Sequence, residues 1–339
     1  MTSTEQIHTF GLSSKVKDII TIKNVEELVA FSDKAINKDF ILLGEGSNCV
    51  FVEDYKGSVL RLSLFGKEIT EAEDSYLVKA SSSENWHEFV KWTLDNNVFG
   101  LENLALIPGT VGASPIQNIG AYGREVKDFV SQVEYYDLLT QKIKYLNNED
   151  CRFSYRDSIF KHELKDKAVI LSVTFKIPKQ WLPEVSYGEL KKLACPTPDC
   201  IFKKVIEIRQ SKLPNPQFVG NAGSFFKNPI VNKIKAEKLR QEFTEMPQYE
   251  INEDSTKLAA GWLIEQCGLK GYELNGAAVH DKQALVLVNK NGDATGLDLI
   301  KLIKLVRESV HKKFGVVLET EVRLIGKCGE YNHIDDIES

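Results

Sequence analysis

The sequence predicts an α+β protein that is divided into more than one domain. Its 339 residues are too many for one simple core and indicate two or three domains. Runs with the strand pattern and runs with the helix pattern recur along the chain. Between Pro178 and Pro216 the sequence changes to prolines, lysines and a helical run, and a second region begins near Leu213. With 42% hydrophobic and 27% charged residues, the composition is ordinary for a globular protein.

The first region begins with a helix and continues mainly as strands. Residues 24–36 predict a helix that Asn24 can cap, with Glu27 completing a capping box. Two apolar runs around a Gly-rich turn predict strand, tight loop and strand over 39–54. Residues 84–97 predict an amphipathic helix, and further strands are expected at 58–62, 76–81, 131–138, 142–146 and 167–177. One side of the amphipathic helix carries Trp86, Phe89, Val90, Thr93 and Leu94.

The second region mixes helices with short strands. The helical pattern occurs at 199–212, 231–243, 256–268 and 296–315. Short strands are expected around 276–280 and 284–289, and a closing strand is expected over 316–326.

The bulk composition excludes several classes of protein. A net charge of −5 argues against a general nucleic-acid binder, which needs a basic face. No apolar run approaches the roughly 20 residues that span a bilayer, and the N-terminus lacks a signal pattern. The six cysteines form no C-x-x-C pair and the six histidines are spread thinly, so no metal site is expected. We expect a cytoplasmic monomer without nucleic-acid or membrane partners.

The segment GEGSN, residues 44–48, resembles a phosphate-binding loop without matching a standard motif. The third glycine of the dinucleotide fingerprint is absent, a strand follows in place of a helix, and there is no Walker lysine. Glycines nevertheless let backbone N–H groups turn inward towards an anion, and Ser47 and Asn48 add donors. A simple hairpin turn is the alternative.

A second Gly-rich segment covers residues 106–123. It is long and apolar, which is typical of a binding loop inside a compact domain. Its glycines, Gly109, Gly112, Gly120 and Gly123, allow a ligand to approach the backbone closely. Ser114, Gln117 and Asn118 can donate hydrogen bonds, while Ile116, Ile119 and Ala121 can line a flat ring. Two such loops indicate a large cofactor held by backbone amides, and a flavin is the natural choice.

Three further motifs are open to a plain structural interpretation. In GNAGSFFKNP, a lone Ser224 precedes two phenylalanines, which a turn into a short strand would also explain. In YRDS, Arg156 stands between a phenol and an aspartate, which a surface ion pair would explain. In LETEVRLIG, Glu319, Glu321 and Arg323 share one strand face, as an exposed edge with salt bridges would require.

Taken together and in this order, these motifs closely resemble the UDP-N-acetylenolpyruvoylglucosamine reductases. SPIQNIGAYG and GNAGSFFKNP carry the resemblance most specifically, and it spans nearly the whole chain. YRDS and VSYGEL look like the type I subgroup, in which a tyrosine loop folds over the substrate. Cys49 stands where an aliphatic residue is common, which is a small departure beside the cofactor loop.

The resemblance implies a fold, a cofactor and a reaction. The fold is a vanillyl-alcohol-oxidase-type (PCMH-type) FAD-binding domain with a separate α+β substrate domain. We expect the FAD-binding domain at 1–212, split near 67, the substrate domain at 213–315, and a returning strand at 316–339. NADPH would reduce non-covalently bound FAD, which would then reduce the enolpyruvyl group of UDP-N-acetylglucosamine enolpyruvate to UDP-N-acetylmuramate for peptidoglycan.

The resemblance also implies site residues. Ser224 would donate the proton, with Arg156 and Glu321 as the other catalytic residues. Substrate contacts would come from Tyr155, Tyr187, Lys212, Asn228 and Gln283. The cofactor-binding residues would be Gly44, Glu45, Gly46, Ser47, Asn48, Pro108, Gly109, Gly112, Ala113, Ser114, Gln117, Asn118, Gly120, Ala121, Tyr122 and Gly123. An FAD-dependent oxidase of a small alcohol and a non-catalytic UDP-sugar-binding protein remain the alternatives.

Overall fold

The computed structural model describes residues 1–5, 7–35 and 39–337, and its contacts divide the chain into two compact units. Unit 1 comprises Met1–Val16, Gly46–Lys56 and Lys212–Ser339, and unit 2 comprises Lys17–Glu45 and Gly57–Ser211. The chain therefore passes from one unit to the other at 16/17, 45/46, 56/57 and 211/212.

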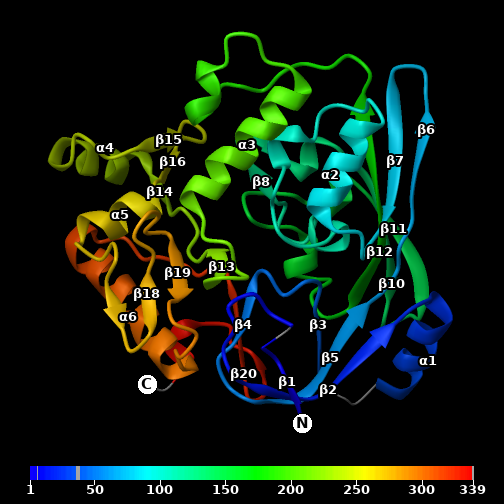
Figure 1. The fold of residues 1–339 in the computed structure, drawn as a ribbon, viewed down its shortest axis with the longest axis horizontal. Helices are drawn as coiled ribbons and strands as arrows, with labels where there is room; N and C mark the ends of the chain where they lie inside the picture. Colours follow the sequence, from blue (N-terminus) through cyan, green and yellow to red (C-terminus); the bar gives the residue numbers. More distant parts are fainter. Residues whose placement is uncertain (6, 36–38, 338–339) are drawn as a thin grey trace. The chain divides into compact units, whose positions relative to one another are not determined.

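Unit 2 is built on a five-stranded antiparallel sheet with the order β11-β10-β12-β7-β6. Figure 1 shows these long strands side by side. A smaller sheet contains the parallel pair of β3 and β5. The strands are β2 (Lys15–Ile22), β3 (Phe40–Leu42), β5 (Tyr55–Leu62), β6 (Lys67–Glu71), β7 (Ser75–Ser81), β8 (Gly120–Ala121), β9 (Arg124–Glu125), β10 (Val130–Asp137), β11 (Lys142–Asn147) and β12 (Ala168–Pro178), and the α-helices are α1 (Val25–Ala35), α2 (Trp86–Asp95) and α3 (Pro198–Lys212).

Helix α2 packs on the large sheet and positions the long Gly-rich loop. Its aromatic side chains Trp86 and Phe89 meet Phe175 of β12, with ring centroids 5.9 and 5.2 Å apart. The same end of the helix holds the loop, since Trp86 donates its backbone N–H to Gly109 O and its indole N–H to Leu104 O, both at 2.9 Å. The amphipathic helix expected from the sequence thus connects the core to the loop.

The start of α1 confirms the expected cap by Asn24, whereas the Glu27 carboxylate accepts from the N–H of Lys23, one residue before the position that a capping box uses. The backbone N–H of Glu27 donates to Asn24 Oδ1, and Glu27 Oε2 accepts from the N–H of Lys23, both at 2.8 Å.

The hairpin alternative for residues 39–54 is wrong. Strand β3 pairs in parallel with β5, whereas β4 (Cys49–Phe51) pairs in parallel with β20 (Arg323–Gly326) near the C-terminus.

Unit 1 surrounds a separate hydrophobic core with helices and short strands. Its four-stranded sheet has the order β13-β19-β18-β17, and β14-β16-β15 and β21-β20-β4 form two smaller sheets. Besides β4 and β20, the strands are β1 (Thr2–Ser3), β13 (Gly220–Ser224), β14 (Ile230–Asn232), β15 (Gln248–Glu250), β16 (Ser255–Leu258), β17 (Glu273–Leu274), β18 (Ala277–Val279), β19 (Val286–Asn289) and β21 (Gly329–Glu330), and the α-helices are α4 (Lys233–Glu242), α5 (Ala260–Gln266) and α6 (Gly296–Phe314). The 3₁₀ helices of the chain are Glu102–Leu104, Val111–Ala113, Val126–Asp128, Glu149–Cys151, Ile159–Lys161, Gly188–Lys192 and Ile334–Asp336.

Two expected elements of this unit are shorter than the sequence suggested. The closing strand expected over 316–326 is confined to β20, because the backbone before it forms an isolated bridge from Thr320 to Phe226 and then bends. Glu319 and Glu321 therefore lie outside this strand. The helix expected over 256–268 begins only at Ala260, because the preceding residues form β16, which pairs with both β14 and β15.

The expected domain limits also differ from the two units. Residues 1–16, 46–56 and 316–339 pack with 212–315, whereas we expected them to group with the rest of 1–212. A shared core is the physical reason, since Phe10, Val50 and Leu324 belong to the same buried cluster as Phe225. The expected division near 67 falls between β5 and β6, which belong to different sheets.

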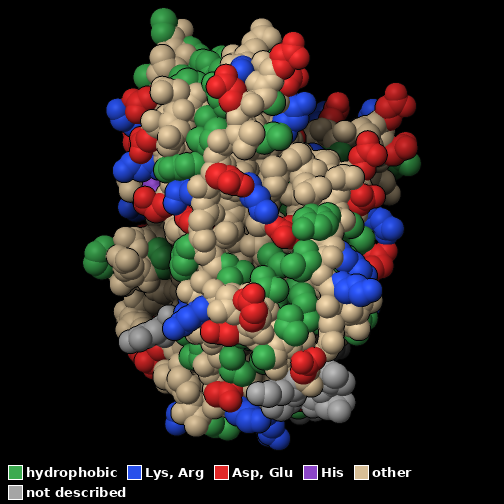
Figure 2. Space-filling model, turned by 90° about the vertical axis from the view of Figure 1, so that its right-hand side faces the viewer, with side chains coloured by type: hydrophobic (Ala, Val, Ile, Leu, Met, Phe, Trp, Pro, Cys, Tyr) green, Lys and Arg blue, Asp and Glu red, His purple; other side chains and the backbone are tan. Residues whose placement is uncertain are grey.

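The molecular surface mixes charges. On the face drawn in Figure 2, basic and acidic side chains are interspersed with hydrophobic ones, as is usual for a surface in contact with solvent. Within the described part of the chain, no helix has both the length and the apolar character needed to cross a membrane.

A buried histidine in unit 1 predicts acid sensitivity. His8 is 3% exposed, and burial lowers its pKa from 6.5 to about 4. The folded ring stays neutral while the unfolded one takes a proton, so stability present above pH 6.5 is lost as the pH falls towards 4. The expected loss is about 1.4 kcal/mol per pH unit in this window.

Denaturant titrations at pH 7 and pH 5 measure this loss. His8→Phe is expected to flatten the pH dependence, because a phenyl ring takes no proton and can still pack near Phe51. The exposed His333 provides the control, since His333→Gln should leave the slope unchanged. An equal slope in His8→Phe and the unsubstituted protein would contradict the prediction.

Candidate active site

The two Gly-rich loops meet in unit 2 through the carboxylate of Glu45. One oxygen accepts a hydrogen bond from Asn85 Nδ2 at 2.7 Å, and the other accepts one from the N–H of Gly109 at 3.1 Å. Beside it, a Cβ placed on Gly44 would lie 3.2 Å from Thr110 Oγ1. Residues 44–45 and 109–110, which are far apart in sequence, therefore form one backbone surface that a ligand can approach closely.

A polar atom beside this surface fits a bound cofactor. Ser82 follows β7 and accepts a hydrogen bond at its carbonyl from the N–H of Gly112, at 2.9 Å. Its hydroxyl is buried and finds no hydrogen-bond partner among the described residues. Buried polar atoms are normally satisfied, so this hydroxyl suits a ligand with donors and acceptors, as a flavin has. Sequence reasoning missed Ser82, although the polar run SSSEN at 81–85 marks the position.

Two of the expected cofactor ligands engage their side chains in hydrogen bonds within unit 2. Ser114 is buried and donates to Val111 O at 2.7 Å. Asn118 is fully buried and donates to Glu125 and to Ser154 O. These side chains hold the loop in shape, which leaves its backbone as the surface offered to a ligand.

The remaining GEGSN residues, Gly46 to Asn48, pack in unit 1. Gly46 has φ 69° and no room for a side chain, since a Cβ would lie 2.0 Å from Ile7 O. Asn48 donates its side-chain N–H to Glu321 O at 3.2 Å and accepts at its own carbonyl from the N–H of Arg323 at 3.0 Å. The loop is thus tied to the C-terminal segment of the same unit.

The YRDS turn places Arg156 against the long Gly-rich loop at 106–123, which we call the flavin loop. Ser154 and Asp157 form an isolated bridge, and Arg156 between them has φ 56°, which a non-glycine residue seldom adopts. Its Nη2 donates to Gly120 O at 3.1 Å, and its guanidinium lies 5.4 Å from the centre of the Tyr155 ring. The half-buried guanidinium is directed at the loop.

A second guanidinium and two tyrosines lie near this turn. Arg209 of α3 donates to Leu106 O at 3.1 Å. Burial lowers the pKa of Arg209. The electrostatic interaction with Tyr122 raises this pKa, and the positive charge of Arg156 lowers it. Tyr122, whose pKa is raised by burial, packs edge-on against Tyr187 with ring centroids 6.0 Å apart. This part of unit 2 combines positive charge with aromatic faces, which suits an anionic group. Sequence reasoning missed Arg209, which stands three residues before the predicted ligand Lys212.

The segments that carry Ser224 and Glu321 are joined through their backbones in unit 1. Ser224 ends β13, where the register shifts between Asn221 and Ser224. Asn221 holds this bulge, since its side chain donates to Pro214 O and Val219 O and accepts from the N–H of Gly223. The next residue, Phe225, is fully buried and accepts the backbone N–H of Glu321 at 2.9 Å.

The two phenylalanines are thus core residues, as the plain interpretation of GNAGSFFKNP expected. They also anchor the strand whose half-buried end carries the Ser224 hydroxyl. The salt-bridge interpretation of LETEVRLIG holds for Glu319, which pairs with Lys227 at 3.2 Å.

The expected substrate ligands lie on both units. In unit 1, Asn228 Oδ1 accepts from the N–H of Ala260 at the start of α5, at 2.9 Å, which leaves its amide N–H₂ group as donor. Gln283 is half-buried beside Gly261, where a Cβ would come within 2.8 Å of its Oε1. Lys212 is exposed at the end of α3. In unit 2, Tyr155 lies in the Arg156 turn and Tyr187 is 45% exposed.

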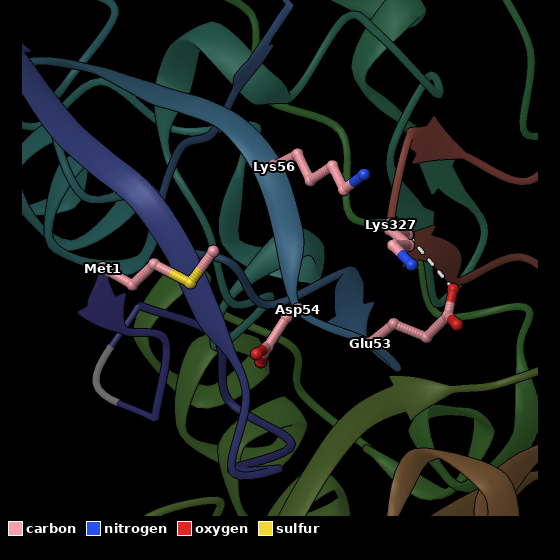
Figure 3. Close-up of a pocket in the computed structure, with 5 residues that line it drawn as sticks. All are labelled: Met1, Glu53, Asp54, Lys56 and Lys327. Atoms are coloured by element: carbon pink, nitrogen blue, oxygen red, sulfur yellow. Dashed lines mark hydrogen bonds between the residues drawn. The ribbon is translucent and has the colours of Figure 1, made fainter.

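Figure 3 shows a pocket of about 350 Å³ in unit 1, lined by Met1, Glu53, Asp54, Lys56 and Lys327. No expected site residue is among these five. Its carboxylates bind within the fold, since Glu53 accepts from the N–H of Lys327 at 3.0 Å and Asp54 accepts from the N–H of Lys15 at 2.8 Å. The pocket is thus a depression near the ends of strands whose carboxylates are already bound by the fold.

Known proteins match the chain along nearly its whole length. Residues 17–143 match the family described as FAD binding domain, and residues 215–325 match the C-terminal domain of UDP-N-acetylenolpyruvoylglucosamine reductase. The reductase of Pseudoalteromonas translucida (strain TAC 125) is 50% identical over 328 residues, which cover 97% of this chain and 96% of the relative. The reductase of Salmonella typhi is 46% identical over 334 residues, covering 97% of each.

A solved structure agrees in fold. The crystal structure of the reductase (MurB) from Thermus caldophilus superimposes with a TM-score of 0.64 over 95% of this chain and 97% of its own, at 21% identity. The predicted fold class, the FAD cofactor and the oxidoreductase activity are confirmed by these matches together. Because relatives that are 46–50% identical to it match 97% of its length, this chain belongs to the UDP-N-acetylenolpyruvoylglucosamine reductase family.

Proposed function

We propose that this flavoenzyme uses NADPH to reduce the enolpyruvyl group of UDP-N-acetylglucosamine enolpyruvate, forming UDP-N-acetylmuramate for peptidoglycan synthesis. The names of the relatives support the reductase reaction, and the match at 17–143 supports the flavin. The observation that carries the proposal is the hydrogen bond from the N–H of Glu321 to Phe225 O, at 2.9 Å. It joins the Glu321 backbone to the residue that follows Ser224, the one hydroxyl in GNAGSFFKNP, which supports a shared role for the two residues.

The three catalytic residues have distinct tasks in this proposal. FAD, when bound, would supply hydride transfer from NADPH to the vinyl carbon far from the substrate carboxylate. Negative charge would then develop on the neighbouring carbon and spread into the carboxylate as an enolate. Arg156, and Glu321 when it carries or shares a proton, stabilise that charge as it forms. Ser224 donates the proton that the enolate carbon takes, helped by nearby positive charge because a serine hydroxyl is a weak acid.

The proposed substrate ligands are assigned by the donor groups that they offer to the substrate. Lys212, Asn228 and Tyr187 can meet the diphosphate, since they supply an ammonium group, an amide N–H₂ group and a phenol O–H. Tyr155 and Gln283 complete the proposed set. The exposed Tyr187 ring rests edge-on against Tyr122, a contact that a bound substrate can replace.

The visible spectrum of the purified protein tests the proposal. We expect a yellow protein that NADPH bleaches under anaerobic conditions and that the enolpyruvyl substrate restores to yellow. Consumption of O₂ with a small alcohol, without a need for the enolpyruvyl substrate, would favour the oxidase alternative. A colourless protein that binds UDP-sugars would favour the binding protein. After acid precipitation, yellow colour in the protein pellet would contradict non-covalent FAD.

Glu45→Gln is expected to weaken FAD binding about 10- to 100-fold. The carboxylate accepts hydrogen bonds on both oxygens, from Asn85 and Gly109, and the amide replaces one of these acceptors by a donor. Bonds to charged groups contribute about 1.5–3 kcal/mol, which corresponds to this range. Titration of the apoprotein with FAD, followed by flavin fluorescence, measures the affinity.

Glu134→Gln is the matched control for Glu45→Gln. Glu134 lies on β10 and is also partly buried in unit 2. It accepts a hydrogen bond from Ser172 Oγ at 2.6 Å. Its substitution removes comparable bonds away from the two loops. If both variants bind FAD equally well, Glu45 does not organise the cofactor surface.

The cytoplasmic location and the monomeric state remain proposals. Size-exclusion chromatography with light scattering tests the second.

A further inference from the structure

Asn118 lies at the junction between the flavin loop and the turn that carries Arg156. Its side chain is fully buried, and its backbone has φ 43°. Both amide hydrogens are engaged, since Nδ2 donates to Glu125 Oε2 at 3.1 Å and to Ser154 O at 2.9 Å. Its Oδ1 accepts from the N–H of Lys127 at 3.1 Å. All of these contacts are made within unit 2.

The contact with Ser154 reaches the first residue of the Arg156 turn. Ser154 and Asp157 exchange backbone hydrogen bonds at 3.0 and 3.3 Å across this turn. At the other end of the turn, Ser158 Oγ donates to Ile116 O at 2.6 Å, again in the flavin loop. The turn is therefore attached to the loop at both ends, and the Asn118 amide makes one of the two attachments.

The turn needs such attachments because its central residue is strained. Arg156 has φ 56°, a conformation that persists only when surrounding contacts impose it. The guanidinium Nη2 donates to Gly120 O, two residues after Asn118. A displacement of Ser154 would thus displace Arg156 relative to the loop that holds the flavin.

We propose that Asn118 is a positioning residue that fixes Arg156 against the flavin loop, and that its side chain is not a flavin ligand. The inference rests on the proposed function, in which Arg156 acts on the substrate carboxylate and not on NADPH. Loss of the Asn118–Ser154 bond should therefore slow reoxidation of the flavin by substrate and leave its reduction nearly unchanged. A side chain that held the flavin itself would affect both half-reactions.

The nearby carboxylate of Glu125 allows a test that separates the two bonds of the amide. Asn118→Asp keeps the acceptor for Lys127 N–H, loses both donors and sets two carboxylates against each other. The combined variant Asn118→Asp with Glu125→Gln exchanges the two groups, which conserves net charge and restores one hydrogen bond between positions 118 and 125. It cannot restore the donor to Ser154 O.

We expect this combined variant to retain FAD and to melt near the unsubstituted protein, because the bond between 118 and 125 is regained. Its flavin should be reduced by NADPH within about 2-fold of the normal rate. Reoxidation by the enolpyruvyl substrate should be slower by about 100-fold, the effect of misplacing a catalytic group by about 1 Å. Stopped-flow absorbance of the flavin measures each half-reaction.

Asn148→Asp is the matched control. Asn148 also donates both amide hydrogens to backbone carbonyls in unit 2, Lys127 O and Val130 O at 2.7 Å each, without touching the Arg156 turn. It should lower the melting temperature while both half-reactions keep their rates.

Three outcomes would overturn the inference. They are normal reoxidation in the combined variant, equal slowing of both half-reactions, and a combined variant that fails to fold or to hold FAD. Failure of the proposed function looks different, because the unsubstituted enzyme itself would then not be reoxidised by the enolpyruvyl substrate.

Discussion

Ser224→Ala should leave the reduction of the flavin by NADPH nearly unchanged and slow its reoxidation by the enolpyruvyl substrate about 10²- to 10⁴-fold. That range is the usual contribution of general acid catalysis. Only the second half-reaction delivers a proton to carbon, so only it needs the hydroxyl. The fold should tolerate the change, because Ser224 is half-buried at the end of β13 and the following Phe225 and Phe226 anchor the strand. Stopped-flow absorbance measures the two halves separately.

Two further variants complete this experiment. Ser224→Cys should recover part of the reoxidation rate, since a thiol can still donate a proton. Ser255→Ala removes a hydroxyl from another strand of unit 1, where it donates to Asn252 Oδ1 at 2.7 Å, and should change neither half-reaction. Equal slowing of both halves by Ser224→Ala would mean that the serine positions the nicotinamide or the flavin and is not the proton donor.

Arg156→Lys should also slow reoxidation, by about 10²- to 10³-fold, although the positive charge is kept. This is the usual effect of removing one donor that stabilises developing negative charge. An ammonium group cannot reproduce the planar guanidinium, which donates to Gly120 O through Nη2 and whose fork geometry suits a carboxylate. The flavin spectrum and the NADPH half-reaction should stay near normal, which stopped-flow absorbance records.

Arg152→Lys is the control for Arg156→Lys. Arg152 stands four residues earlier, also has a positive φ of 48°, and makes an exposed ion pair with Glu163. Exposed pairs contribute little, so its rates should match those of the unsubstituted enzyme. If Arg156→Lys retained full reoxidation activity, a point charge would suffice and the guanidinium geometry would have no role.

Local patterns in the sequence predicted the elements whose stability is local. The cap of α1 by Asn24 follows from a short-range hydrogen bond, and the apolar side of α2 follows from periodicity. The predicted length of the closing strand was wrong because the extent of that strand depends on a distant partner. Only residues from Arg323 onwards find β4, while Thr320 meets Phe226 of another segment.

The candidate site shows the same division. Glycine spacing and polarity predict that GEGSN and the loop at 106–123 bind a ligand, because close approach to a ligand requires glycine at particular points, and this stays a prediction. That Glu45 joins these loops, and that Asn118 and Ser114 bond within the fold, could not be read from the sequence. Those roles depend on which carbonyls and N–H groups the tertiary packing leaves nearby.

The residue types of the motifs set the chemistry available to this protein, namely a serine, an arginine and a glutamate, together with the glycines of the loops. How these groups are held depends on the packing of distant segments. The backbone of Glu321 bonds to Phe225, the residue after Ser224, and the strained Arg156 turn is attached to the flavin loop by Asn118 and Ser158. The physical reason is that a residue type fixes what a side chain can donate or accept, whereas its partners are set by contacts between segments far apart in the chain.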